Sequence, residues 1–219
     1  MFENNSVNLA NQLSDLLLPT RCAICNEFPS PLCELCFERI QLRPRQISRS
    51  GIQGITFTEY KDDIANLLNA FKEQGQRRIG QRLALELTHH LSKPKVDFLL
   101  PVPSKALSFA DRGFNPAKVL AGTLGKCWRL AVAESHFIRQ PKDQVGLGRA
   151  ERQQNLHESI KLSQRLSGAR VMLVDDIVTS GATITELARA AKAVGAVVLG
   201  FITIAESVPK PPTLNSKKV

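Results

Sequence analysis

Residues 171–183 read VMLVDDIVTSGAT, and this stretch decides the fold. The apolar run from Val171 to Val174 is typical of a buried strand. Two adjacent acids follow it, and a small, hydroxyl-rich turn then leads into residues 183–194, whose apolar residues recur at helical spacing. In open α/β sheets, ligands bind beyond the carboxyl ends of the strands. The stretch therefore predicts a strand–turn–helix unit with a binding site at its turn.

The residue types in this turn suit a phosphate, and the two acids suit a sugar. Free N–H groups and the helix dipole favour an anion at the start of a helix, and Gly181 has no side chain to block its approach. Asp175 and Asp176 would repel a phosphate, but carboxylates accept hydrogen bonds from sugar hydroxyls. The alternative is a plain helix start, in which Asp176 only caps the helix and Gly181 only turns the chain.

A second segment, PVPSKA at residues 101–106, follows the apolar run 96–100 and so also leaves the end of a strand. Ser104 and Lys105 offer hydrogen-bond donors and a positive charge. Two prolines beside a strand can also mark a simple turn. Because the first motif is also present, we interpret the segment as an anion-binding loop formed by Val102, Pro103, Ser104 and Lys105.

Strand-like and helix-like patterns alternate from residue 52 onward, which predicts a mainly parallel α/β sheet with helices on both faces. The polar stretch 139–155 is long for a plain connection and is typical of a lid or binding loop. We expect an α/β domain over residues 51–206. The end of the chain, 207–219, is expected to be a disordered tail.

The first 50 residues are expected to form a separate small module. Apolar residues at helical spacing predict a short helix over 9–17, and the polar segment 41–51 is interpreted as a linker. Between them, four cysteines are spaced C-x2-C-x7-C-x2-C and predict a structural, tetrahedral zinc site; they are Cys22, Cys25, Cys33 and Cys36. An iron–sulfur cluster and metal-free or redox cysteines are the alternatives. Cys127 is expected in the core.

Composition and charge narrow the class of protein. With 43% hydrophobic and 22% charged residues, the chain has the composition of a globular protein. The net charge of +9 lies wholly in residues 51–219, since residues 1–50 hold five basic and five acidic side chains. This surplus favours a nucleic acid or a phosphate-rich small molecule as partner. Because no stretch approaches 18 apolar residues and no basic region precedes the first apolar segment, we expect no membrane span and a cytoplasmic protein.

The thirteen residues 171–183 resemble the phosphoribosyl-diphosphate motif of the phosphoribosyltransferase superfamily. The resemblance implies a type I phosphoribosyltransferase-like fold and a ligand that binds with Mg²⁺. It places Asp175 and Asp176 on the ribose 2′- and 3′-hydroxyls. It places the 5′-phosphate among Thr179, Ser180, Gly181, Ala182 and Thr183. Residues 101–106 resemble the pyrophosphate loop of amidophosphoribosyltransferase.

Three further stretches resemble the ComF family: YKDDIANLLNAFKEQG (60–75), RGFNPAKVLA (112–121) and QVGLGRAERQQNL (144–156). By this resemblance, residues 139–156 form a flexible loop whose Arg149 and Arg152 reach the diphosphate, although both can equally be solvated charges. Arg112 and Asn115 are expected at the pocket floor. We find no positioned general base in the sequence. The histidines are expected to be non-catalytic: His89, His90, His136 and His157.

The ComF resemblance implies a role in DNA uptake during natural transformation or in DNA utilisation. Single-stranded DNA and a DNA-processing helicase are the partners expected from it, besides phosphoribosyl diphosphate or a related sugar phosphate. The alternative is an active phosphoribosyltransferase in nucleotide salvage or metabolism. The sequence does not decide whether the protein is catalytically active.

Overall fold

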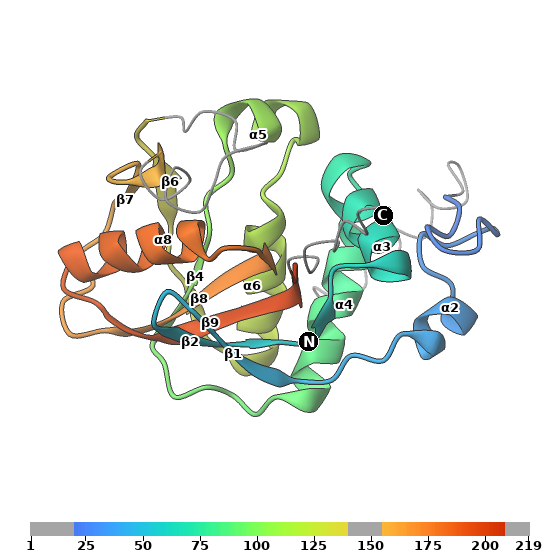
Figure 1. Cartoon of the computed structure of the whole chain (residues 1–219), viewed down its shortest axis with the longest axis horizontal. Coiled ribbons are helices and arrows are strands. Elements are labelled where there is room, and N and C mark those ends of the chain that lie inside the picture. Colours follow the sequence, from blue (N-terminus) through green and yellow to red (C-terminus); the bar gives the residue numbers. More distant parts are fainter. Residues whose placement is uncertain (1–19, 140–154, 209–219) are drawn as a thin grey trace, which may run out of the picture.

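A seven-stranded sheet forms the centre of the protein in a computed structural model, which describes residues 20–139 and 155–208 (Figure 1). The strand order is β1-β2-β9-β8-β4-β5, with β3 also pairing with β9. Among the described residues every pairing in this sheet is parallel except β1 with β2. The strands are β1 (Arg45–Arg49), β2 (Ile52–Thr56), β3 (Thr58–Glu59), β4 (Phe98–Pro101), β5 (Ala131–Val132), β8 (Arg170–Val178) and β9 (Val197–Glu206).

Helices cover both faces of the sheet. Successive side chains of a strand point to opposite faces, so the apolar residues of the central strands form a core on each side. Val174 of β8 points into a core shared with α3 (Asp62–Glu73), α4 (Arg77–His90) and α6 (Pro116–Trp128). Its neighbour Leu173 points into the opposite core, with α8 (Ala182–Ala193). The central strands are aliphatic on both sides, as buried parallel strands are. The predicted fold class is confirmed.

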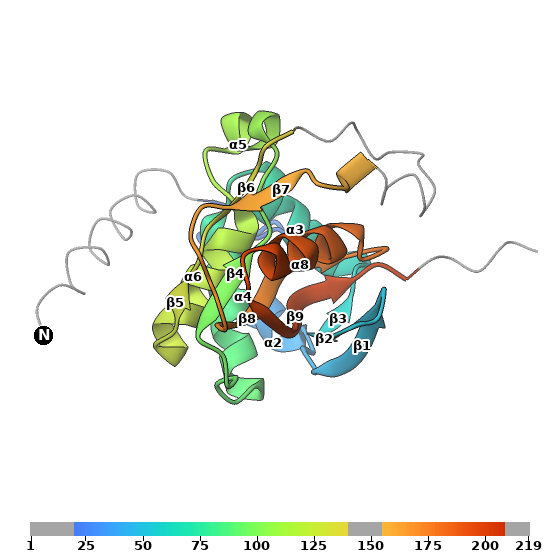
Figure 2. The same cartoon turned by 90° about the vertical axis from the view of Figure 1, so that its left-hand side faces the viewer.

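The structure differs from the predicted linker over residues 41–51, because β1 lies inside it and pairs antiparallel with β2. Ser50 and Gly51, which join the two strands, both have positive φ angles, 51° and 80°. Positive φ at both central residues is the geometry of a tight hairpin turn. Figure 2 shows β1 at one edge of the sheet and β5 at the other.

Besides β1 and α2 (Glu34–Arg39), three more elements were absent from the prediction. The short helix α5 (Ala106–Arg112) follows the 101–105 loop, and β6 (Ser135–Phe137) pairs antiparallel with β7 (Ile160–Leu162) in a separate two-stranded sheet. In Figure 1, α5, β6 and β7 all lie on the upper side of the molecule. Of the three, α5 and β6 contribute residues to the cavity at the carboxyl ends of β4 and β8.

The cysteine segment packs directly against the helices of the α/β fold. Cys36 of α2 and Cys22 are buried in the same core cluster as residues of α3 and α4. The guanidinium of Arg82 in α4 lies 4.1 Å from the ring centre of Phe37 and also contacts Glu34. The division of the chain after residue 50 stays a prediction. The helix predicted over 9–17 and most of the predicted tail lie outside the described residues.

No described helix is both long and apolar enough to cross a membrane.

Candidate functional site

A cavity of about 300 Å³ lies beyond the carboxyl ends of β4 and β8. It brings together residues of the two motifs that the sequence singled out. From the first motif it is lined by Asp175, Asp176 and Thr183, and from the second by Val102, Pro103, Ser104 and Lys105. Thr179, Ser180 and Gly181 lie in the adjoining turn and Ala182 begins α8, and these four residues are not among those that line the cavity.

The two motifs meet because β4 and β8 are parallel neighbours. Pro101, the last residue of β4, lies opposite Val174. The Val102 N–H then donates to the Val174 carbonyl across 2.9 Å. Since the carboxyl ends of parallel strands meet at one edge, the loop after each strand opens onto the same space.

Asp175 and Asp176 are each held by the backbone that follows them. Asp175 Oδ1 accepts from the Asp176 N–H at 2.9 Å, and Asp176 Oδ1 accepts from the Ile177 N–H at 2.8 Å. Asp176 therefore bonds within β8 and does not cap α8, which was the alternative considered for it. Asp175 is partly exposed and Asp176 is 4% exposed.

Lys72, near the end of α3, is a site residue that sequence reasoning missed. Its Nζ lies 3.1 Å from Asp176 Oδ2. Burial lowers the pKa of Lys72, but the charges of Asp176 and Asp175 outweigh this and raise it, so the ammonium stays charged. Lys72 belongs to the segment 60–75, yet its spacing there indicates only a helix. Only the folded chain shows that it reaches the acids.

The surroundings of Asp175 disfavour its charged form. Burial is the main cause that raises the pKa of Asp175 well above its ordinary value, and the adjacent charge of Asp176 raises it further. Lys72 acts in the opposite direction. Two neighbouring carboxylates disfavour each other's ionisation, and a hydroxyl-bearing or cationic ligand would relieve this.

The turn before α8 leaves the start of that helix available to an anion. Gly181, the residue before the helix, has φ 83° and contributes no side-chain cap, and the Ser180 hydroxyl accepts from the Ala182 N–H at 3.4 Å. Its carbonyl accepts from the Thr185 N–H at 2.8 Å, which begins the helical hydrogen-bond pattern. Free N–H groups of a first turn favour negative charge. The local geometry thus suits a phosphate.

Arg112 and Asn115 both line the cavity. Asn115 Nδ2 donates to the Val102 carbonyl at 2.9 Å, and its Oδ1 accepts from the Lys118 N–H at 3.2 Å as the cap of α6. Asn115 thereby ties the 102–105 loop to α6. Arg112 Nε donates to the Ser108 carbonyl at 2.8 Å, and its guanidinium adds positive charge beside the loop.

The other predicted residues fall elsewhere. Arg149 and Arg152 lie outside the described residues. No histidine of the described chain lines the cavity. His89 and His90 each contact Glu86, at 3.2 and 3.1 Å, and His136 lies 3.4 Å from Ser163 Oγ.

Cys127 is exposed, so its expected core position is wrong: the buried stripe of α6 includes Leu124 and Trp128, and Cys127 falls outside it.

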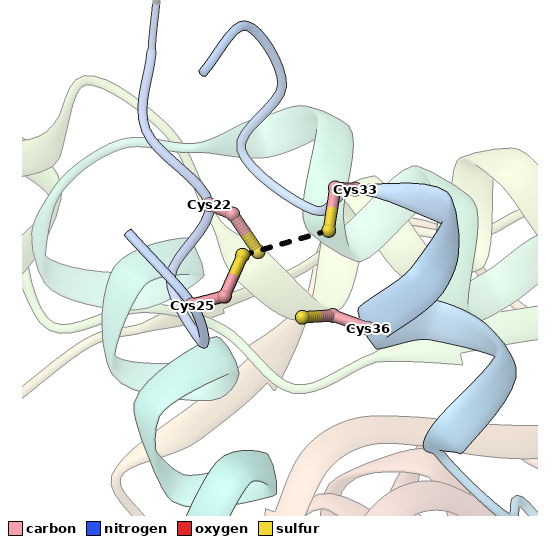
Figure 3. A group of neighbouring side chains, drawn as sticks. All are labelled: Cys22, Cys25, Cys33 and Cys36. Atoms are coloured by element: carbon pink, nitrogen blue, oxygen red, sulfur yellow. Dashed lines mark hydrogen bonds between the residues drawn. The ribbon is translucent and has the colours of Figure 1, made fainter. Parts of the chain in front are cut away.

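The four N-terminal cysteines can hold a metal ion. Figure 3 shows their side chains directed toward one another, and the four Sγ atoms all lie within 4.8 Å of each other. The Cys25 and Cys33 sulfurs are 3.7 Å apart. Sulfurs around one tetrahedral zinc, with Zn–S bonds of about 2.3 Å, lie about 3.8 Å apart. The donor set therefore fits a single metal ion.

The surroundings of these thiols differ. Burial raises the pKa of Cys22, but backbone hydrogen bonds from residues 25, 33 and 24 outweigh it and lower the pKa to about 6. Burial raises the pKa of Cys36 to about 12, helped by the neighbouring cysteines. Four thiolates at this distance need a cation to be stable together.

Comparison with known proteins agrees with the geometry. The phosphoribosyl transferase domain family matches residues 73–214. Competence protein F of Haemophilus influenzae is 29% identical over 151 residues, which are 62% of this chain and 65% of that protein. The DNA utilization protein YhgH of Salmonella typhi is 25% identical over 179 residues, covering 77% of this chain and 75% of that protein.

Among solved structures, an adenine phosphoribosyltransferase from Thermoanaerobacter pseudethanolicus matches with a TM-score of 0.44 and 16% identity. The match covers 74% of this chain and 83% of that one.

Asp175→Asn is expected to raise the free energy of unfolding at neutral pH by about 1 kcal/mol, because it removes a charge that the fold disfavours. Between the ordinary pKa of the carboxyl and its raised value, the folded state binds more protons than the unfolded state. The stability of the unsubstituted protein therefore falls as pH rises through this window. The gain should vanish at acidic pH. Denaturant unfolding over a pH series measures it.

Asp176→Asn is the matched control. It removes the partner of Lys72 and is expected to lower stability at neutral pH. If both variants lose the same free energy of unfolding at neutral pH, the environment assigned to Asp175 is contradicted.

Proposed function

Because the chain belongs to the phosphoribosyl transferase domain family and is a ComF-like member of it, we propose that it binds phosphoribosyl diphosphate and acts in DNA uptake or DNA utilisation. One observation carries the proposal. The acid pair, the 102–105 loop and Thr183 in the first turn of α8 line one cavity at one edge of the sheet. Each of the three suits a different part of that ligand.

The ligand's groups are assigned by charge and hydrogen-bonding type. Asp175 and Asp176 accept from the ribose hydroxyls, and the turn 179–183 holds the 5′-phosphate. The diphosphate, bound as its Mg²⁺ complex, lies against the 102–105 loop. The positive charges of Lys72, Lys105 and Arg112 around the cavity balance the charge of the phosphates.

The alternative, an active phosphoribosyltransferase in nucleotide salvage or metabolism, has less support. Its acceptor would need a general base and a slot for a nucleobase. Phe137 is the one aromatic residue among those that line the described cavity, and no histidine is among them. The names of the relatives, competence protein F and DNA utilization protein, favour the DNA process.

We assign zinc to the four cysteines, in a structural role. All four positions of a tetrahedral ion would be taken by protein sulfur, so no position is left for a reacting water. A polynuclear iron–sulfur cluster would need its thiolates farther apart than these lie. The metal would link residues around Cys22 to the start of α2, since Cys33 precedes that helix and Cys36 lies in it.

A contact with single-stranded DNA is supported by charge. The whole surplus of +9 lies in residues 51–219. Arg149 and Arg152 are the residues proposed to contact either the diphosphate or the DNA. A DNA-processing helicase is the partner proposed for the cysteine segment, which would then bring the phosphoribosyl site to the DNA.

The double variant Asp175→Asn with Asp176→Asn is expected to bind phosphoribosyl diphosphate with Mg²⁺ at least about a hundredfold more weakly than the unsubstituted protein. Each charge-assisted hydrogen bond lost contributes roughly 1.5–3 kcal/mol, and asparagine keeps the size of the side chain. Calorimetric titration of both proteins measures the affinities. Equal affinities would exclude the acids from the site.

Single-stranded DNA titrated into the same two proteins is the second arm of this experiment. Direct contact with DNA predicts binding that weakens with salt, with a log–log slope of about −0.7 per phosphate neutralised. The acid-pair variant should retain this binding. No binding to DNA even at low salt would exclude direct contact and leave recruitment by a protein partner.

Elemental analysis of the purified protein should find one zinc ion per chain. A strong chelator is expected to expose the cysteines and loosen α2, while the strands around the cavity keep their structure, because no proposed ligand lies beyond Cys36. Thiol titration and hydrogen exchange follow the two regions separately. Iron in place of zinc, or a folded protein without metal, would contradict the assignment.

A further inference from the structure

Arg49, the last residue of β1, reaches the turn that precedes α8. Its Nε donates to the Thr179 carbonyl at 3.1 Å, across 130 positions of sequence. β1 lies at the edge of the sheet, in the hairpin that the sequence did not predict. A cation from a distant part of the chain thus contacts the main chain of the turn that is proposed to hold the phosphate.

Glu206 holds Arg49 in place. It lies at the end of β9 opposite Val178, directly before the turn, and its side chain is 8% exposed. Its Oε2 contacts the Arg49 guanidinium, and its Oε1 contacts Arg45 at 3.1 Å. A buried carboxylate with two arginine partners is well satisfied, which fixes the orientation of both guanidinium groups.

Gly181 permits this approach. A Cβ atom built on Gly181 would lie 2.6 Å from the Arg49 Cβ, much closer than two carbon atoms can lie. Residue 181 therefore lacks a side chain for two reasons, its φ of 83° and the presence of β1 beside it. The turn and β1 are fitted to each other.

The contact with the Thr179 carbonyl has a consequence for the next N–H group. The carbonyl of Thr179 and the N–H of Ser180 belong to one trans peptide, so they point in opposite directions. Arg49 draws the carbonyl toward β1, and the Ser180 N–H is thereby directed away from β1. An N–H group fixed in this way is ready to donate to an anion without reorganisation.

We propose that Arg49, held by Glu206, is a positioning residue of the phosphate turn and presents the Ser180 N–H to the 5′-phosphate. The inference rests on the proposed function, because it requires a phosphoribosyl ligand in this cavity. It is specific for one end of that ligand. The diphosphate lies against the 102–105 loop, which Arg49 does not contact among the described interactions.

Two smaller ligands test the two ends of phosphoribosyl diphosphate separately. Calorimetry with ribose 5-phosphate, and separately with pyrophosphate and Mg²⁺, is carried out on the full chain. Arg49→Gln is expected to lower the affinity for ribose 5-phosphate roughly tenfold, which is the effect of losing one oriented hydrogen bond to an anion. Its affinity for pyrophosphate should be unchanged. Arg49→Lys keeps the ion pair with Glu206 but lacks the guanidinium Nε–H. Its unfolding temperature should equal that of the unsubstituted protein, and its affinity for ribose 5-phosphate should still be lower.

Arg45→Gln is the matched control. It removes the other arginine from Glu206, but no contact of Arg45 with the turn is among the described interactions. Its affinity for ribose 5-phosphate should stay within about twofold of the unsubstituted protein. If Arg45→Gln loses as much affinity for ribose 5-phosphate as Arg49→Gln does, the two arginines only anchor the hairpin and the inference is wrong.

The outcomes also distinguish this inference from the proposed function. If the unsubstituted protein binds neither ribose 5-phosphate nor pyrophosphate, the proposed function fails and the inference fails with it. If the unsubstituted protein and Arg49→Gln bind ribose 5-phosphate equally well, the inference alone is overturned. Should Arg49→Gln fail to fold, Arg49→Lys decides between the same two results.

Discussion

The parallel pairing of β4 with β8 is the constraint on which the site depends. It places Pro101, the last residue of β4, opposite Val174, so the loop after β4 emerges beside Asp175 and Asp176 near the carboxyl end of β8. One strand end carries two carboxylates and the other carries donors and a positive charge. A sugar phosphate has hydroxyls and anionic groups a few ångströms apart, and this edge offers partners for both. A change in register between the two strands would separate them.

Charge balance at this edge comes from parts of the chain that lie far from both motifs. Lys72 of α3 compensates the acid pair, and Arg49 of β1 contacts the turn before α8. Both helix and strand are held by the packing of the fold: α3 lies in the core with α4, and β1 is joined to the sheet through β2. The cysteine segment packs on α4, which contacts α3, and it precedes β1 in the sequence.

Local patterns predicted the parts of the site that are contiguous in sequence. The run VMLVDD followed by TSGAT contains its own strand, turn and helix start, and 101–106 contains its own strand end, so periodicity and residue type were sufficient. The four cysteines were found by spacing alone. In each case the signal lies within about fifteen residues, which is the range of periodicity and turn chemistry.

The parts that were missed depend on contacts between distant residues. The segment RQISR of β1 lacks apolar alternation, and only the Ser50–Gly51 pair signalled its turn. Lys72 looks like an ordinary helix-surface lysine until α3 is placed beside β8. Cys127 was expected inside, but the buried stripe of α6 passes it by. Tertiary packing decides such positions, and a single sequence does not show it.

Hydrogen exchange of the full chain, with and without phosphoribosyl diphosphate and Mg²⁺, tests the central claim most directly. If one ligand spans the two strand ends, its binding should slow exchange in both loops, 101–106 and 179–183, although they are far apart in sequence. The helix α4, none of whose residues lines the cavity, should be unaffected. Protection of only one loop, or of neither at saturating ligand, would contradict a shared phosphoribosyl site at this edge.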